Sequence, residues 1–379
     1  MRIAFHAPLK PPTHPVPSGD RAMARLLMAA MTRAGHQVEL AVRLRSRDAG
    51  GDPERQARFA AAGKRLADHL VRRYRGRPDG APDAWFTYHL YYKAPDRVGP
   101  SVSAALGIPY IVAEASVAAR RANGAWAGSH AAVTAALSQA SLVLGLNSAD
   151  HAGVAPYLSS PQRWQPLKPF VDDAPFAAAA LERSRHRAAL AAAHGLDTSV
   201  PWLIAVGMMR PGDKLASYRE LAQSLRLIKD RAWRLLVVGD GIARPEVEAA
   251  IKEAATQRAL FLGRCEPALL AGIYAAADLC VWPAVNEAFG MSLLEAQAAG
   301  LPVVAGRWGG VPDVVADGIA GRLVARHDVA AFAQAVAGFL DEPEARRAAG
   351  AAAAHRVTSQ HGLAGAVTAL DAALARLRR

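Results

Sequence analysis

The chain has 379 residues, long for one domain and sufficient for two, and its 52% hydrophobic and 21% charged residues exclude a disordered protein. Two cysteines that form no Cys-x-x-Cys pair exclude a disulfide scaffold and a cysteine zinc site. The formal net charge is +12, which raises the question of an anionic partner.

The first half alternates short apolar runs with longer amphipathic stretches, the pattern of an α/β domain with a parallel sheet. A strand at 3–7 is followed by a proline-rich loop, and a helix then runs from Asp20 to the turn at Gly35. Further strands are expected at 38–42, 85–88, 110–113 and 142–146. The opening strand, loop, helix and strand form a βαβ unit.

The helix expected at 54–75 is strongly basic. One stripe carries Phe59, Leu66, Leu70 and Tyr74. The other faces carry Arg55, Arg58, Lys64, Arg65, Arg72, Arg73 and Arg75. A solvated surface helix explains this pattern, and so does a basic helix that lies on anionic lipid or contacts an anionic acceptor.

The second half repeats the alternation after a helical connector at 177–194. Strands are expected at 202–207, 234–239, 260–263, 279–282, 303–305 and 321–324, with a closing helix at 362–379. We predict a first domain at 1–172, a second at 173–355 and a C-terminal closing segment at 356–379. The carboxyl ends of two parallel sheets are expected to face a central cleft, where such folds bind ligands.

Two loops of the second half carry glycines directly after a strand. Arg210 and Lys214 follow Gly207 in the first loop, and paired cations suit a diphosphate. The second loop, Gly239-Asp240-Gly241, is not the Gly-x-Gly-x-x-Gly fingerprint of dinucleotide-binding folds. A dehydrogenase is therefore disfavoured.

The most specific pattern lies at 286–305, where Glu287 and Glu295 are separated by seven residues. Glu287 is expected in a loop and Glu295 about two turns into the following helix. The first turn of that helix, near Gly290, offers free amides and the positive end of a dipole to an anion. Either glutamate can accept hydrogen bonds from sugar hydroxyls.

Residues 203–324 resemble the retaining, nucleotide-sugar-dependent glycosyltransferases of family 4, the group-1 transferases. The likeness rests on the two-glutamate string, on Gly239-Asp240-Gly241 and on the run at 309–315, which follow the family's order and spacing. With the loop at Gly19 and with Val171-Asp172, where the chain leaves the first domain, the likeness covers most of the chain. It implies the GT-B fold, two Rossmann-like α/β domains with parallel sheets.

The resemblance also implies roles for single residues. Arg210 and Lys214 would hold the donor diphosphate, and Glu287 would grip the donor sugar, so these three are the catalytic candidates. Glu295 would hold the ribose, with Arg264 and Cys265 against the base. The other donor-binding candidates are Gly207, Asp240, Gly241, Phe289, Gly290, Met291, Ser292 and Leu293. The acceptor-side candidates are Gly19, Asp20, His89 and Glu114.

Two positions depart from the family's pattern. Met208 stands where the family commonly has an arginine directly after the glycine. Glu114-Ala115-Ser116 follows the strand after which many relatives carry a histidine. His89, at the end of the neighbouring strand, is a candidate for the missing side chain.

The implied function is transfer of a sugar from a nucleoside diphosphate donor to an acceptor hydroxyl with retention of configuration, in the synthesis of cell-surface polysaccharide or glycolipid. No Asp-x-Asp element occurs, so neither a metal nor a cofactor is expected beyond the co-substrate. Two alternatives stay open: a nucleotide-sugar-binding protein without transferase activity, and a GT-B sugar-nucleotide epimerase.

The positive charge is concentrated in the first half. Residues 1–172 contain 22 Lys and Arg against 12 Asp and Glu, whereas residues 173–379 contain 23 against 21. No nucleic-acid-binding module is recognisable, so we expect a glycan or lipid-linked acceptor and no nucleic acid. The N-terminus has no signal-peptide core, which predicts a cytoplasmic protein, with attachment to the anionic inner face of a membrane as a further hypothesis.

Overall fold

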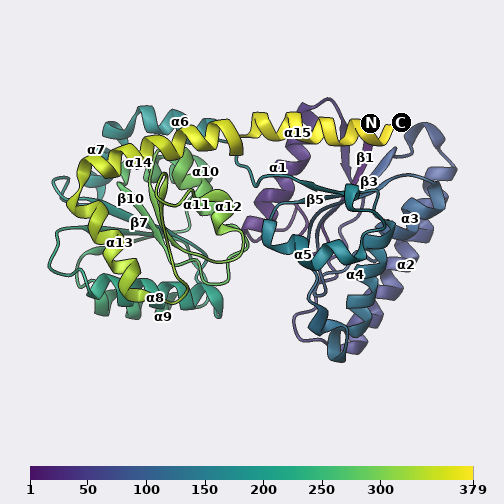
Figure 1. Ribbon diagram of the computed structural model, residues 1–379, viewed down its shortest axis with the longest axis horizontal. Coiled ribbons are helices and arrows are strands. Elements are labelled where there is room, and N and C mark those ends of the chain that lie inside the picture. The colour runs from purple at the N-terminus through teal and green to yellow at the C-terminus, as the bar shows by residue number, and fades with distance from the viewer. Residues whose placement is uncertain (379) are drawn as a thin grey trace. The chain divides into compact units, whose positions relative to one another are not determined.

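A computed structural model describes residues 1–378 and divides the chain into two compact units. The first unit contains Met1–Lys168 and the C-terminal segment from Ala364 onward, and the second contains Pro169–Leu363. Each unit is built around one parallel sheet of six strands (Figure 1). The predicted fold class, two Rossmann-like α/β domains, is confirmed.

The first sheet has the strand order β2-β1-β3-β4-β5-β6. Its strands are β1 (Arg2–His6), β2 (Gln37–Leu40), β3 (Ala84–Leu90), β4 (Tyr110–Ala115), β5 (Leu142–Gly145) and β6 (Trp164–Pro166). The central strands are buried on both faces, as expected for a parallel sheet that helices cover on both sides. Their carboxyl ends therefore meet along one edge.

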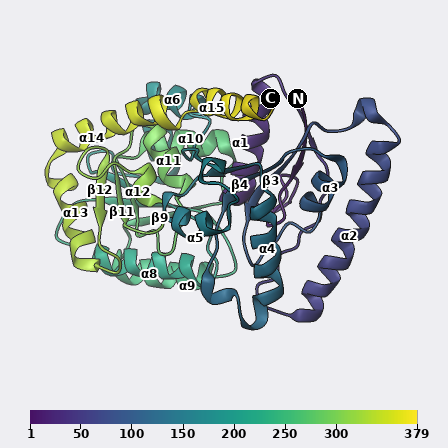
Figure 2. The same ribbon diagram turned by 45° about the vertical axis from the view of Figure 1, so that its right-hand side comes forward.

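Helices cover both faces of this sheet. They are α1 (Gly19–Arg33), α2 (Pro53–Arg75), α3 (Gly99–Leu106), α4 (Ala127–Gln139) and α5 (His151–Val154). Side chains of α2, α3 and α4 share one core cluster with the sheet, and α1 lies on the other side (Figures 1 and 2). Ser18 caps α1 through the amide of Arg21, and Asp52 caps α2 directly before Pro53, as N-terminal helix signals predict.

A buried carboxylate ties the first sheet together. Asp96 accepts hydrogen bonds from Thr87 Oγ1 (2.5 Å) and from the amides of Val98 (2.8 Å) and Gly99 (2.9 Å), and its Oδ1 lies 3.1 Å from His6 Nδ1. Burial opposes ionisation, but His6 and these donors outweigh it and lower the pKa of the Asp96 carboxyl. The charge is thus fully partnered inside the core.

The second sheet has the order β12-β11-β10-β7-β8-β9. Its strands are β7 (Trp202–Val206), β8 (Arg234–Val238), β9 (Ala259–Gly263), β10 (Leu279–Trp282), β11 (Val303–Gly306) and β12 (Gly321–Val324). The helices of this unit are α6 (Ala174–Leu181), α7 (Arg183–His194), α8 (Asp213–Arg226), α9 (Arg244–Ala254), α10 (Pro267–Ala276), α11 (Met291–Ala298), α12 (Val311–Val314), α13 (Val329–Asp341) and α14 (Pro343–Arg356). Helix α15 (Leu363–Ala375) belongs almost entirely to the first unit. Helices α8 and α9 lie on one side of the sheet, and α10 and α11 lie on the other (Figures 1 and 2).

Some elements differ from the sequence prediction. Strand β6 was not predicted because a three-residue edge strand that ends in proline has no hydrophobic period. The predicted connector helix is two helices, α6 and α7, which meet at Glu182. The closing segment begins with a π-helical turn at Val357–His361 before α15. Within residues 1–378, no helix combines the length and the apolar character needed to cross a bilayer.

Candidate active site

In the second unit, the loops after β7 and β8 are bonded to each other along their backbones. The amide of Met209 donates to the carbonyl of Asp240 (3.0 Å), and the amide of Ala243 donates to the carbonyl of Met209 (3.0 Å). Gly239 and Gly241 have φ angles of 139° and 154°. A Cβ atom on Gly239 would overlap the carbonyl oxygen of Gly207, and one on Gly241 would overlap that of Met209. Glycine is required here because the two backbones touch.

Lys214 and Glu287 form the central ion pair of this edge. Lys214 Nζ, in the first turn of α8, lies 2.5 Å from Glu287 Oε2 in the loop after β10. The indole Nε1 of Trp282 donates to the same carboxylate oxygen (3.4 Å), and the Lys214 ammonium lies 5.2 Å from the Trp282 ring centroid. Both partners are mostly buried, with side-chain exposures of 14% and 20%. The pair is therefore stronger than an exposed one.

The loop that carries Glu287 has a constrained backbone. Ala284 and Asn286 have positive φ angles of 57° and 52°, which non-glycine residues rarely adopt. The amide of Val285 donates to Ser217 Oγ (2.9 Å), and Asn286 Nδ2 donates to Asp213 Oδ2 (3.1 Å). These bonds to α8 compensate for the unfavourable conformation and fix Glu287 beside Lys214.

The first turn of α11 follows Glu287 at the same edge. Gly290 is its N-cap, and the side chains of Phe289, Met291 and Leu293 are buried, whereas Ser292 is partly exposed. The amides of Met291 and Ser292 belong to a first helical turn, which has no partners for them inside the helix. Amides there can donate to an anion.

Glu295 lies one helical turn further along α11, against a tyrosine of α10. Tyr274 Oη lies 3.1 Å from Glu295 Oε2 and 3.2 Å from the carbonyl oxygen of Ser292. Burial raises the pKa of the Glu295 carboxyl to about 7, although the tyrosine hydroxyl opposes this shift. Glu295 thus titrates near neutral pH.

The other donor-side candidates lie on neighbouring loops. Arg210, Asp240, Gly241 and Arg264 are exposed, and Cys265 is partly buried beside the end of β9. Met208 is partly exposed in the same loop as Arg210. These residues follow β7, β8 and β9, three adjacent strands, so they share one sheet edge. Arg210 extends from it as an exposed cation.

In the first unit, the acceptor-side candidates come together at the carboxyl edge of the sheet. His89 Nδ1, on β3, lies 3.1 Å from Asp20 Oδ1 of α1 and 3.9 Å from Glu114 Oε1 of β4. Burial lowers the pKa of the His89 imidazole, but Glu114 and Asp20 outweigh it and raise the pKa to about 9. Gly19 is the first residue of α1, directly before Asp20.

A fourth titratable side chain, Asp150, was not among the sequence candidates. It precedes α5, in the segment after β5. The charges of both Glu114 and His89 affect the pKa of its carboxyl. Burial and then Glu114 raise the pKa of the Asp150 carboxyl to about 6. Its position soon after a strand, in line with His89 and Glu114, was the available signal. We name Asp20, His89, Glu114 and Asp150 the His89 cluster.

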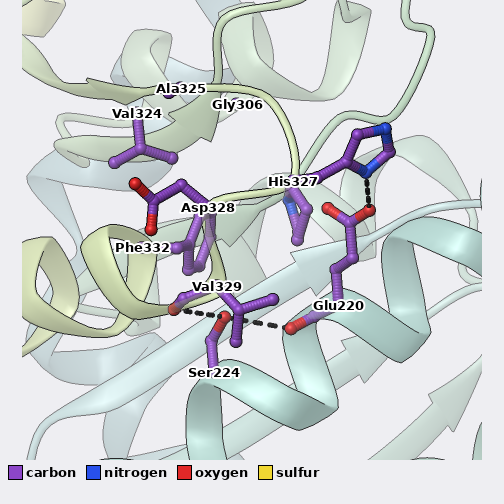
Figure 3. Close-up of a pocket in the computed structure, with 10 residues that line it drawn as sticks. Glu220, Ser224, Gly306, Val324, Ala325, His327, Asp328, Val329 and Phe332 are labelled. Carbon is purple, nitrogen blue, oxygen red and sulfur yellow. Dashed lines mark hydrogen bonds and ion pairs between the residues drawn. The ribbon is translucent and has the colours of Figure 1, made fainter.

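A separate pocket of the second unit contains none of the predicted residues. It lies between α8 and the segment after β12, and His327 Nδ1 lies 2.5 Å from Glu220 Oε1 at its mouth (Figure 3). Ser224 Oγ lies within hydrogen-bonding distance of the carbonyl oxygens of Glu220 (2.9 Å) and Val329 (3.2 Å). Its polar groups bond to one another, which is typical of a contact that packs two elements together.

Among residues 1–378, no group of three or more His, Cys, Asp or Glu side chains is arranged to hold a metal ion. The His89 cluster does not form such a group.

Part of the second unit matches a known protein family. Residues 200–342 match the family model for glycosyl transferases group 1. The chain is 38% identical over 183 residues to the D-inositol 3-phosphate glycosyltransferase of Nocardia farcinica, which covers 46% of this chain and 40% of that protein. It is 45% identical over 121 residues to the enzyme of that name from Mycolicibacterium paratuberculosis, which covers 31% of this chain and 26% of that one. The chain thus matches well under half the length of these curated relatives.

Solved structures are similar over nearly the whole chain. Sucrose-phosphate synthase from Thermosynechococcus elongatus has a TM-score of 0.75 at 20% identity, and the match covers 99% of this chain and 98% of that one. HepE of Anabaena, solved in complex with UDP-glucose, has a TM-score of 0.72 at 17% identity and covers 99% and 100%. At these identities the likeness establishes the fold. Residues 200–342 therefore resemble the glycosyl transferases group 1 family, and the chain as a whole has the GT-B fold.

Proposed function

We propose that this protein is a glycosyltransferase that moves a sugar from a nucleoside diphosphate donor to an acceptor hydroxyl and retains the anomeric configuration. The observation that carries the proposal is the arrangement of Lys214, Glu287 and the first turn of α11 at one sheet edge. A cation and helix amides suit a diphosphate, and the carboxylates suit sugar hydroxyls. Retention rests on the likeness to the group-1 family.

The proposed chemistry is electrostatic. As the glycosidic bond to the donor breaks, negative charge develops on the leaving diphosphate. Lys214, Arg210 and the amides of α11 would stabilise that charge, and removing one such preorganised contact typically costs about 3–4 kcal/mol in the transition state. Glu287 would orient the donor sugar, and Glu295 would hold the ribose.

We propose that transfer requires no metal ion, with the nucleotide sugar as the co-substrate. Undiminished transfer in the presence of EDTA would support this, and loss of transfer that Mg²⁺ or Mn²⁺ restores would refute it.

The direct test of the donor is a thermal-shift panel of nucleotide sugars, because a bound ligand raises the unfolding temperature according to its concentration relative to Kd. One base and sugar should stabilise the protein, and Lys214→Ala should abolish the shift. A protein that binds a donor yet neither transfers nor hydrolyses it would be a binding protein. Conversion of the donor without an acceptor would indicate an epimerase.

We further propose a role in cell-surface polysaccharide or glycolipid synthesis, with docking on an anionic surface through α2. All seven basic residues of α2 are exposed, while its apolar stripe packs into the first unit through Ala67, Leu70 and Tyr74. Docking would thus be electrostatic, without insertion into lipid. Binding to anionic but not neutral vesicles, lost at high salt, tests this proposal.

A further inference from the structure

Trp282, the last residue of β10, contacts both members of the ion pair between Lys214 and Glu287. Its side chain is 1% exposed, and its indole Nε1 donates to Glu287 Oε2, the oxygen that Lys214 also contacts. The ammonium of Lys214 lies 5.2 Å from the centroid of the same indole. One buried ring therefore bonds to the carboxylate through its N–H and attracts the cation through its aromatic system.

The indole of Trp282 is packed on two further sides. The ring of Tyr218, on α8, lies edge-to-face against it with the centroids 4.9 Å apart, and the Tyr218 hydroxyl donates to the carbonyl of Gly207 (2.8 Å). A Cβ atom on Gly207 would lie 3.0 Å from Cη2 of the indole, so the loop after β7 packs directly on the ring. Close packing of this kind fixes the direction of the indole N–H.

The two donors to Glu287 Oε2 lie at different distances. Lys214 Nζ is 2.5 Å away, whereas Trp282 Nε1 is 3.4 Å away, beyond the roughly 2.7–3.2 Å that is usual for an N–H···O bond. The carboxylate is therefore held mainly by the ammonium, and the indole is a second donor that can come closer. A mostly buried carboxylate oxygen that loses one donor should move toward the donor that remains, because an unpaired oxygen there is costly.

We propose that Trp282 is a positioning residue, which keeps Glu287 at the donor sugar when a diphosphate draws Lys214 away. This inference rests on the proposed function, in which the diphosphate and Glu287 are alternative partners of one ammonium group. Without the indole N–H, the carboxylate would lose its remaining donor in the bound state. Trp282 therefore affects recognition and turnover of the sugar, and leaves binding of the diphosphate nearly unchanged.

The first test records the indole N–H resonances of the full chain by NMR. The resonance of Trp282 is assigned by its absence in Trp282→Phe and, in the unchanged protein, by its contacts with protons of Tyr218, so the assignment does not depend on one variant. We expect it to move downfield when UDP, GDP, ADP or CDP binds, and also in Lys214→Ala without nucleotide, since the bond to Glu287 shortens in both cases. A resonance that stays in place in either experiment would overturn the proposal.

The second test compares Trp282→Phe with a matched control, Trp233→Phe. Trp233 is also buried, donates through Nε1 to the carbonyl of Ile228 (3.0 Å) and has the Arg258 guanidinium 5.0 Å from its ring centroid. It directly precedes β8, however, and so lies at the opposite edge of the sheet.

For both variants, calorimetry measures the Kd of the nucleotide sugar identified by the panel and that of its nucleoside diphosphate. We expect Trp282→Phe to weaken binding of the nucleotide sugar about tenfold relative to the diphosphate and to lower kcat, which corresponds to the loss of one hydrogen bond to a charged group. Trp233→Phe should change neither quantity. Circular dichroism establishes that each variant is folded.

The outcomes separate this inference from the proposed function. Equal weakening of the nucleotide sugar and its diphosphate in Trp282→Phe, or the same selective loss in Trp233→Phe, would overturn the positioning role and leave the transferase proposal standing. A chain that binds no nucleotide at all would overturn both.

Discussion

Lys214 Nζ lies 2.5 Å from Glu287 Oε2, so the cation proposed for the diphosphate and the carboxylate proposed for the sugar are partners of each other. A bound diphosphate would compete with Glu287 for the ammonium group. Each residue also fixes the position of the other, and the two substitutions below should therefore have different effects on binding and on turnover.

Removing the ammonium should affect donor binding and turnover together. We expect Lys214→Ala to reduce turnover about a hundredfold or more, since it removes a preorganised contact to the leaving group. It also leaves Glu287, 20% exposed, without its cation. Steady-state kinetics with the donor from the panel tests this. Lys229→Ala, at an exposed position, is the matched control, and a normal rate in Lys214→Ala would contradict the assignment.

Changing the carboxylate should separate sugar recognition from diphosphate recognition. We expect Glu287→Gln to bind a nucleoside diphosphate at least as tightly as the unchanged protein, because Lys214 loses its competing partner. Glu287→Ala should lower turnover about a hundredfold. Calorimetry with the nucleotide sugar identified by the panel and with its nucleoside diphosphate compares the two effects. Weaker binding of the nucleoside diphosphate by Glu287→Gln would place the carboxylate on the phosphate or nucleoside side.

Donor affinity should depend on pH through Glu295. Its carboxyl has a pKa of about 7, so it is largely neutral at pH 6 and ionised at pH 8. An ionised carboxylate accepts stronger hydrogen bonds from ribose hydroxyls, and we expect affinity for the nucleotide sugar identified by the panel to rise about threefold to tenfold over this range. Calorimetry at both pH values measures it. Glu295→Gln should flatten the profile, and an unchanged slope would assign the titration to another group.

Stability should decline at alkaline pH as His89 loses its proton. Its folded pKa of about 9 lies above the value near 6.5 of an unfolded histidine. The stabilisation from protonated His89 is therefore complete below about pH 6.5 and is lost as pH rises through 9, on the order of 2 kcal/mol. Urea unfolding from pH 6 to 10 measures this loss. In His89→Gln, the free energy of unfolding should fall less steeply between pH 6 and pH 10. An equally steep fall would contradict the pairing of His89 with the carboxylates.

Asp150 should destabilise the fold at neutral pH. Its carboxyl has a folded pKa of about 6 against an ordinary value near 4, so its favourable contribution is complete below pH 4 and is lost as pH rises through 6. We expect Asp150→Asn to increase the free energy of unfolding at pH 7.5 by about 1 kcal/mol and to change little at pH 4. Destabilisation at pH 7.5 would show that the carboxylate makes favourable contacts there.

Much of the architecture could be predicted because it follows from local patterns. Apolar runs in a parallel sheet are buried on both faces, and the strands β10 and β12 coincide with the predicted ranges 279–282 and 321–324. Likewise, Asp20, His89 and Glu114 were candidates through the resemblance to the group-1 family, and each lies near the carboxyl end of a predicted strand or at the start of a helix. The short edge strand β6 has no such pattern.

The partners within the sites could not be predicted. Tyr274 and Trp282 lie in elements that sequence periodicity assigns to the core, yet their polar atoms bond to Glu295 and Glu287. Asp150 joins the His89 cluster only because β5 pairs with β4. These relationships depend on tertiary packing. The sequence shows at most, as for Asp150, that a carboxylate follows a strand.

The contact between the Gly207–Met209 backbone and the Gly239–Gly241 backbone also limits how this protein can be redesigned. Exchanging one of these loops for that of a transferase with another donor preference would bring mismatched main chains together, with a side chain where only hydrogen fits. Both loops would have to be transplanted as one cassette. Natural change in either loop faces the same coupling, since a side chain at Gly239 or Gly241 would overlap the backbone of the other loop.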